Sequence, residues 1–254
     1  MIEQTELNSY VRPEHLQPSS IAQYRGEFRS HPAHVVVIHD YLRDEVAARI
    51  SRFLSLEVRY GMEYEVRGGG RVAREDWLRS DPQDRLCAVE IMVGVRREFI
   101  LSPNLVTCLR FQHILRTGAG LNFFEEISGY KLTGIGFSVR SMSYGQQVLD
   151  HVDDSGTRRL AFSLYLTPGW EPCFGGALCL TGRSGHLTRV EAEYNCLVVF
   201  DATIHTLHHV TTIENPPLGL KRLSLGGWLH GKRSEMVEEG APPSRTEHIG
   251  AGGR

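Results

Sequence analysis

The segment Leu160-Ala-Phe-Ser-Leu-Tyr-Leu166 is one of six short stretches rich in β-forming residues that follow Gly129. The other five cover residues 136–140, 177–180, 196–200, 208–213 and 222–225. Turns that contain glycine and proline separate these stretches evenly, which is typical of an antiparallel sandwich or jelly roll. The sequence therefore predicts a mainly β protein with flanking helices, in which the second half of the chain forms a double-stranded β-helix of the jelly-roll or cupin-like kind.

The chain before Gly129 is expected to begin with a strand and then to support the sheet with helices. Val35-Val-Val-Ile38 is a β-branched run, and apolar residues recur at helical spacing in residues 46–54. The apolar residues of 104–127 suit two further helices, broken at Gly118-Ala-Gly120.

A charged stretch from Tyr60 to Asp84 separates these predicted helices and contains Gly68-Gly-Gly70. Three consecutive glycines favour a turn, so we expect a hairpin or a mobile loop with Trp77 as its anchor. Loops of this kind often lie over a binding site, but a plain surface loop is the favoured interpretation here.

The chain is expected to fold as one domain, because 254 residues with 41% hydrophobic content can bury one sizeable core. Residues 35–233 are assigned to a single double-stranded β-helix domain with N-terminal helical support. Residues 1–34 contain prolines and show no sustained period, so we expect an N-terminal arm that is ordered only where it packs. Residues 234–254 are expected to form a polar C-terminal tail.

Composition and charge exclude several classes of function. A net charge of -2 and a pI near 6.6 provide no basic field, so a directly bound nucleic acid is not expected. The five cysteines form no C-x-x-C pair, which argues against a disulfide framework or a zinc knuckle. No stretch is apolar enough to span a membrane. We therefore expect a cytoplasmic protein, and the sequence is compatible with an oligomer.

The stretch His151-Val-Asp153 offers an imidazole and a carboxylate at alternate positions of an extended segment, where both side chains point to the same side. A second imidazole from the cluster His205, His208 and His209 would complete a set of three metal ligands. Strand alternation favours His208, with His209 as the second choice. Two histidines and one carboxylate with open positions opposite them are typical of a site for ferrous iron. We predict that His151, Asp153 and His208 bind the metal.

Arg222 follows this histidine cluster in Lys-Arg-Leu-Ser-Leu-Gly-Gly-Trp and suits a dicarboxylate co-substrate. A planar guanidinium can bind the distal carboxylate of 2-oxoglutarate through two parallel hydrogen bonds. Ser224 lies two residues further along and on the same face, so it can add a hydroxyl donor. Tyr165 is expected to point into the barrel and to offer its phenol to the same carboxylate, although packing alone is an equal alternative.

Together these residues predict a dioxygenase that depends on Fe(II) and 2-oxoglutarate and that hydroxylates an unactivated C–H bond, releasing succinate and CO2. The metal and the co-substrate supply the oxidative chemistry, and the protein holds them and selects the C–H bond. We expect Fe(II), 2-oxoglutarate and O2 to be required, with ascorbate as a reductant. The catalytic residues are the same as the metal ligands, His151, Asp153 and His208.

Several segments resemble the catalytic domain of the eukaryotic prolyl hydroxylases that modify a ribosomal protein. The resemblance is dense from about Gly129 to Gly231. It rests on residues 158–166, Trp170, residues 175–178, residues 194–201, residues 208–210 and residues 222–231. The resemblance implies a prolyl hydroxylase of the same architecture, with iron at His151, Asp153 and His208 and with 2-oxoglutarate at Tyr165 and Arg222.

The sequence departs from this family at Met142, where the family commonly has a tyrosine, while Tyr144 lies nearby but out of phase. A second, non-catalytic β-helix domain of the larger relatives is also not expected here. The candidate substrate contacts are Tyr144 and Trp228, of which Trp228 is also a candidate core residue.

The favoured substrate is a prolyl residue in a protein or peptide. The alternative is a free amino acid or a small biosynthetic intermediate, for which a closed pocket with a charged group would be expected. A more distant alternative is a non-catalytic metal-binding β-barrel module, in which a buried arginine for a carboxylate would have no clear role.

Overall fold

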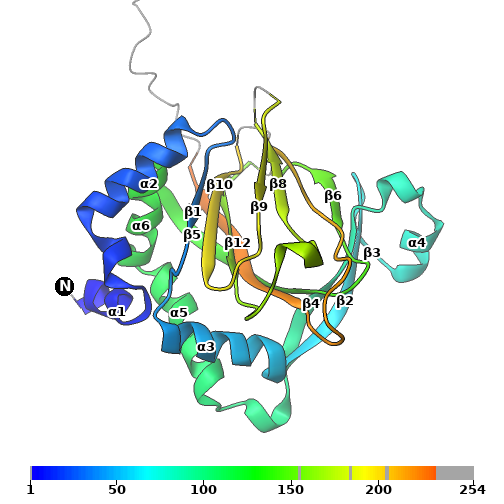
Figure 1. Cartoon of the computed structure of the whole chain (residues 1–254), viewed down its shortest axis with the longest axis horizontal. Helices are drawn as coiled ribbons and strands as arrows, with labels where there is room; N and C mark the ends of the chain where they lie inside the picture. Colours follow the sequence, from blue (N-terminus) through cyan, green and yellow to red (C-terminus); the bar gives the residue numbers. More distant parts are fainter. Residues whose placement is uncertain (1, 154–155, 183–184, 204–205, 233–254) are drawn as a thin grey trace, which may run out of the picture.

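The computed structural model describes residues 2–153, 156–182, 185–203 and 206–232. Within these residues a twelve-stranded, mostly antiparallel sheet curls into a nearly closed barrel with helices on its outside (Figure 1). The prediction of a mainly β fold of the jelly-roll kind with flanking helices is therefore confirmed.

The barrel has two walls, which we call the major and the minor wall. The strands of the major wall lie in the order β1 (Val35–Ile38), β10 (Cys196–Asp201), β7 (Arg158–Tyr165), β12 (Arg222–Gly231) and β5 (Leu132–Met142). Those of the minor wall are β6 (Val148–His151), β11 (Leu207–Val210), β8 (Leu178–Thr181) and β9 (Leu187–Val190). Strand β4 (Cys87–Val95) joins the walls, because it pairs with both β5 and β6.

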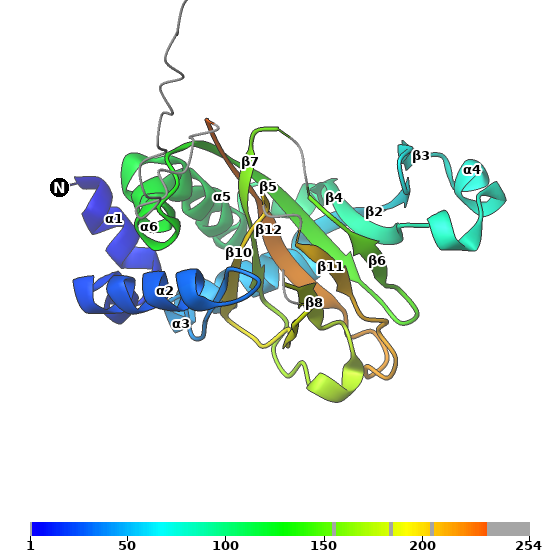
Figure 2. The ribbon, with the colours of Figure 1, turned by 90° about the horizontal axis from the view of Figure 1, so that it is seen from above.

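Helices cover the outer face of the major wall (Figure 2). They are α1 (Ile2–Tyr10), α2 (Pro18–Ser30), α3 (Asp44–Arg52), α5 (Pro103–Arg116) and α6 (Gly118–Ser128). Strands β2 (Val58–Val66) and β3 (Gly70–Val72) form a hairpin that projects from the barrel together with α4 (Arg74–Arg79). Short helical turns complete the chain: η1 (Pro13–Leu16), η2 (Phe53–Glu57), η3 (Pro82–Asp84), η4 (Arg97–Phe99) and η5 (Pro172–Phe174). No described helix is long and apolar enough to cross a membrane.

The central strand β7 shows how the two faces of the major wall differ. Leu160, Phe162 and Leu164 are buried in the core that the wall shares with the helices. Ala161 and Tyr165 point the opposite way and belong to a second buried cluster inside the barrel. Side chains alternate along an extended strand, so one strand can serve the helix-packed core and the barrel interior at the same time.

The expected helical and hairpin elements are present with small changes in their bounds. The two helices around Gly118 are α5 and α6, and the turn at residues 68–70 joins β2 to β3. Trp77 packs on Tyr64 with ring centroids 5.6 Å apart and lies under the guanidinium of Arg85. It therefore anchors α4 to the hairpin, as the sequence predicts.

Residues 2–30 differ from the expected N-terminal arm, because they form α1, η1 and α2. Pro13 and Pro18 stand in the first turns of η1 and α2, where a missing N–H group breaks no helical hydrogen bond. Only Ile21 and Phe28 of α2 are buried, and this sparse contact gives no strong helical period. The predicted tail at residues 234–254 lies outside the described residues.

Gly120 in the first turn of α6 allows this helix to approach the end of α5. A Cβ atom added there would lie 2.5 Å from the carbonyl oxygen of Ile114 and 2.5 Å from the Cα of Leu115. Gly26 in α2 provides a contrast, since a Cβ atom added there would meet no atom within 4 Å. Gly120 thus lies at the predicted break between two helices, and its lack of a side chain also allows these helices to pack closely.

We expect Gly120→Ala to lower the free energy of unfolding by about 1–3 kcal/mol, because the added methyl group must push α5 and α6 apart. The matched variant Gly26→Ala should raise it by up to about 1 kcal/mol, since alanine favours an exposed helix over glycine. Urea unfolding followed by circular dichroism measures both changes. Equal effects of the two variants would contradict the close contact at Gly120.

Candidate active site

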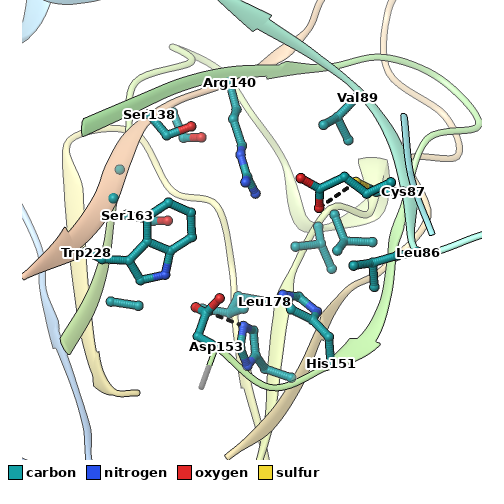
Figure 3. A pocket seen from close by; sticks show the side chains of 18 of the residues that line it. Leu86, Cys87, Val89, Ser138, Arg140, His151, Asp153, Ser163, Leu178 and Trp228 are labelled. Carbon is teal, nitrogen blue, oxygen red and sulfur yellow. Dashed lines mark hydrogen bonds and ion pairs between the residues drawn. The ribbon is translucent and has the colours of Figure 1, made fainter. Parts of the chain in front are cut away.

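A cavity of about 660 Å³ lies between the two walls of the barrel. Side chains from β5, β7 and β12 line it on one side, and those from β6 and β11 line it on the other (Figure 3). Cavities of this size hold small-molecule ligands and cofactors in many proteins. If the residues predicted from the sequence form a binding site, their side chains should meet at this cavity.

Three of these residues meet at the minor wall. His208 on β11 pairs directly across the sheet with His151 at the end of β6. Asp153 follows β6, and its Oδ2 lies 3.5 Å from Nε2 of His208. One ligand atom from each of the three residues lies within 4.8 Å of those of the other two. The strand pairing thus brings residues that are more than fifty positions apart into one cluster.

Backbone carbonyls orient both imidazoles. Nδ1 of His151 lies 2.9 Å from the carbonyl oxygen of Leu149, and Nδ1 of His208 lies 2.9 Å from that of Thr206. A carbonyl oxygen only accepts a hydrogen bond, so Nδ1 carries the proton in both rings. In the neutral rings the Nε2 atoms are therefore free to bind a metal ion.

The surroundings of this cluster favour a neutral His151 and an ionised Asp153. Burial lowers the pKa of His151, and the neighbouring His208 lowers it further. Burial alone would raise the pKa of Asp153, but hydrogen bonding and charge interaction with His208 hold it below its usual range. Arg158 also lies 3.4 Å from Oδ1 of Asp153. Two neutral imidazoles and one carboxylate carry a charge of −1 together, which suits a divalent cation.

Arg222 on the major wall is buried without an anionic partner. No carboxylate among the described residues forms an ion pair with it, and its Nε has no hydrogen-bond partner. Its guanidinium lies 4.6 Å from the ring centroid of Tyr165, whose hydroxyl also lacks a partner. Burial lowers the pKa of Arg222, because the charged form loses its hydration. A buried guanidinium of this kind is a site for an anionic group that enters the cavity.

The pairing of β5, β12 and β7 arranges the side chains of this wall in rows. Arg222 is opposite Met142, and the next row consists of Arg140, Ser224 and Tyr165. Nη1 of Arg222 lies 3.6 Å from the sulfur of Met142. Met142 is therefore a direct neighbour of the arginine, and Ser224 lines the cavity.

The two candidate substrate contacts have different positions. Trp228 lines the cavity, lies under the guanidinium of Arg158 at 3.8 Å and turns its indole nitrogen toward Asp153 (Figure 3). Tyr144 is 74% exposed and does not line the cavity, because it lies in the turn that follows the end of β5 at Met142. Of this pair, the structure brings only Trp228 to the site.

The alternative histidines do not join the cluster in the described part of the chain. His209 is on the opposite face of β11, where its Nδ1 lies 2.8 Å from Asp150. This position follows from the alternation along the strand, on which the choice of His208 was based. His205 lies outside the described residues.

Arg140 and Arg158 are cavity residues that the sequence reasoning did not select. Arg140 precedes Met142 by two residues on β5, so strand alternation alone would have placed it on the same face. Arg158 lies at the start of β7, and its role depends on a contact with Trp228 that no sequence pattern shows. The first residue was predictable from the strand period, and the second was not.

The fold and the cluster together define a class of protein. A double-stranded β-helix with two histidines and one carboxylate inside it, and with a buried arginine on the facing wall, is typical of non-haem iron oxygenases that use a keto acid. The donor set fits Fe(II), and the unpartnered Arg222 fits a carboxylate.

The family model for the 2OG-Fe(II) oxygenase superfamily matches residues 137–230 of this chain. The segment begins within β5 and ends within β12, so it includes the cluster of His151, Asp153 and His208 together with Arg222. The superfamily implies Fe(II), 2-oxoglutarate and O2 as metal and co-substrates.

Two curated relatives are prolyl 3-hydroxylases. The chain is similar to prolyl 3-hydroxylase OGFOD1 of Xenopus laevis, with 33% identity over 123 residues, which are 45% of this chain and 24% of the relative. It is also similar to prolyl 3-hydroxylase OGFOD1 of Mus musculus, with 30% identity over 116 residues, which are 43% of this chain and 21% of the relative. The chain thus spans about a quarter of the length of these relatives.

Solved structures share the fold at low sequence identity. A prolyl-4-hydroxylase of Pseudomonas putida matches with a TM-score of 0.57 and 19% identity, over 84% of this chain and 99% of that chain. A prolyl hydroxylase of Trichoplax adhaerens, solved with a peptide fragment of hypoxia inducible factor, matches with a TM-score of 0.56 and 13% identity, over 84% and 93%. The epimerase SnoN matches with a TM-score of 0.53 and 13% identity, over 90% and 94%. These neighbours support the jelly-roll fold.

Because its charge is buried without a partner, Arg222 is expected to destabilise the metal-free protein. We predict that Arg222→Met raises the free energy of unfolding by about 1–3 kcal/mol, since an apolar side chain of similar length removes the uncompensated charge. Urea unfolding of the metal-free protein measures this change.

Arg159 provides the matched control, because it is also buried but donates hydrogen bonds to the carbonyls of Lys232, Arg158 and Gly156. Arg159→Met should lower the free energy of unfolding by about 1–3 kcal/mol, since these carbonyls lose their donors. Destabilisation by both variants would argue against an uncompensated charge at Arg222.

Proposed function

We propose that this protein is an Fe(II)- and 2-oxoglutarate-dependent dioxygenase that hydroxylates a prolyl residue in a protein or peptide and releases succinate and CO2. One observation carries the proposal. A cluster of two imidazoles and one carboxylate on the minor wall faces a cavity whose major wall holds a buried arginine without an anionic partner. This arrangement has one place for a metal ion and another for a carboxylate.

His151, Asp153 and His208 bind the metal in this proposal. The carbonyls of Leu149 and Thr206 hold both rings with Nε2 available, so little reorganisation accompanies metal binding. Asp153 stays ionised and offsets one positive charge of the ion. Fe(II), once bound together with 2-oxoglutarate and O2, supplies the oxidising power for attack on an unactivated C–H bond.

Arg222 binds the distal carboxylate of 2-oxoglutarate, with Tyr165 and Ser224 as additional donors. The hydroxyl of Tyr165 is buried and lacks a partner, and Ser224 is buried beside it in the neighbouring strand. A bidentate arginine and two hydroxyl groups would satisfy a carboxylate in a site that excludes water. The co-substrate would thus restore the hydrogen bonds that these buried groups lack.

A prolyl substrate is supported by the names of the curated relatives and by the position of Trp228 beside the metal cluster. A neighbour of the same fold was solved with a bound peptide. A free amino acid or a small intermediate is the second candidate, and the half-buried charge of Arg140 in the cavity favours it. Either substrate would enter beside Trp228.

The proposal also covers the domain organisation of the protein, its reductant and its location in the cell. Residues 35–233 carry the catalytic unit, and the helices of residues 2–30 support it through buried contacts such as that of Phe28. Ascorbate serves as a reductant for the iron. All five cysteines are free in the structure, which agrees with the reducing conditions of a cytoplasmic location.

Anaerobic titration of the metal-free protein with Fe(II) and then 2-oxoglutarate tests the assignment of the site. We expect the weak visible absorption band that arises when a keto acid chelates Fe(II). The band should be lost in His208→Ala, which removes a metal ligand. In Arg222→Ala it should appear only at about 10-fold or higher concentrations of 2-oxoglutarate, because a charged hydrogen-bond donor is lost.

His209→Ala is the matched control, because His209 lies next to His208 but on the opposite face of β11. It should leave the band unchanged. Absence of the band in folded wild-type protein would contradict the oxygenase assignment, and loss of the band in His209→Ala but not in His208→Ala would show that the wrong histidine was chosen.

A further inference from the structure

Arg140 on β5 is a second cationic group in the cavity that has no anionic partner. No carboxylate in the described part of the chain forms an ion pair with its guanidinium, and its buried Nε has no hydrogen-bond partner. Its side chain extends from the major wall into the cavity (Figure 3). The buried Nε therefore lacks the hydrogen bond that it would make in solution.

The carboxylates near the cavity form their ion pairs with other arginines. Arg158 is paired with Asp153 at 3.4 Å, and Arg71 is paired with Glu63 at 2.6 Å and with Glu65 at 3.6 Å. Arg140 and Arg222 are the two buried or half-buried arginines of the cavity for which the described residues supply no carboxylate. If 2-oxoglutarate binds as proposed, its distal carboxylate neutralises Arg222 and its other carboxylate lies at the metal. Arg140 is then still without a partner.

Arg140 lies toward the part of the cavity in which a substrate would bind. Its guanidinium carbon is 5.9 Å from the ring centroid of Trp228. Two rows of the wall, those of Ser224 and Gly226, lie between Arg222 and Trp228, since every second residue of β12 faces the cavity. Arg140 stands in the first of these rows, and its guanidinium extends from there toward Trp228 and away from the end of the cavity at Arg222.

The row between Ser224 and Trp228 keeps this part of the cavity open. It consists of Ser138, Gly226 and Ser163, all of which line the cavity. Gly226 is packed so closely that an added Cβ atom would lie 2.6 Å from the carbonyl oxygen of Phe162. Small side chains in this row leave room for a ligand between Arg140 and Trp228.

We infer that Arg140 binds a carboxylate of the substrate, so that the preferred substrate is an anionic prolyl compound whose carboxylate is close to the carbon that is hydroxylated. This inference rests on the proposed function. The carboxylate belongs either to the prolyl unit itself, as in a free or C-terminal residue, or to an adjacent acidic side chain. In both cases it would form charge-assisted hydrogen bonds with Arg140.

The test compares binding of matched acids and neutral compounds to the anaerobic complex of the full chain with Fe(II) and 2-oxoglutarate, measured by isothermal titration calorimetry. The first pair is N-acetyl-L-proline and N-acetyl-L-prolinamide. The second pair consists of blocked tripeptides in which the central proline is followed by aspartate or by asparagine. In the wild type we expect the acid of at least one pair to bind about tenfold more tightly than its neutral partner.

Arg140→Gln should reduce this preference to within about twofold, because glutamine keeps much of the size but loses the charge. Arg140→Lys should retain part of it. Arg116→Gln is the matched control, since the guanidinium of Arg116 also lies over an aromatic ring, 4.6 Å from the centroid of Phe137, but on the helix-packed face of β5. It should leave the preference unchanged.

The same preparations separate failure of this inference from failure of the proposed function. If the keto-acid absorption band does not form in the folded wild type, the proposed function fails. If the band forms, three results would overturn the inference. The first is an equal preference for the acids in Arg140→Gln and in the wild type. The second is weaker binding of 2-oxoglutarate by Arg140→Gln while the preference for the acids is unchanged. The third is that no compound of either pair binds. A preference in the first pair alone identifies a terminal carboxylate, and one in the second pair alone identifies an acidic neighbour.

Discussion

The antiparallel pairing of β12 between β5 and β7 is the constraint on which the cavity depends. It sets Arg222 opposite Met142 and places Ser224 between Arg140 and Tyr165. Side chains alternate between the two faces of a strand, so a shift of the register by one residue would turn these groups into the core beneath the helices. Gly227 helps to fix the register, because an added Cβ atom would lie 1.9 Å from the carbonyl oxygen of Gly136.

Features with a local origin could be predicted from the sequence. The period of two in β7, the pair His151 and Asp153, and the alternation that selects His208 over His209 all depend on the geometry of a single strand. Strand β4 was not predicted, since most of its side chains are half-buried and no clear alternation separates its faces. The helices of residues 2–30 were missed for a related reason, because they are held mainly by a few contacts with distant parts of the chain, such as that of Phe28.

The charge balance of the cavity also could not be predicted from the sequence. Whether an arginine has a partner depends on which carboxylates the fold brings near it, and the pairs of Arg158 with Asp153 and of Arg71 with Glu63 differ in this respect from Arg140 and Arg222. Uncompensated buried charge reduces the stability of the free protein, and ligands that neutralise it bind to the folded state and stabilise it. If the two arginines bind the proposed ligands, the stability of this fold is coupled to ligand binding through them.

The division of the site between two walls has a consequence for the length of the co-substrate. The proposed metal ligands come from the minor wall and the loop after β6, and Arg222 comes from the major wall. A dicarboxylate that binds both must bridge the gap between the walls, which the packing of side chains inside the barrel holds constant. The separation of the walls therefore sets a minimum length for the co-substrate. A dicarboxylate too short for this gap could reach the metal or the arginine, but not both at once.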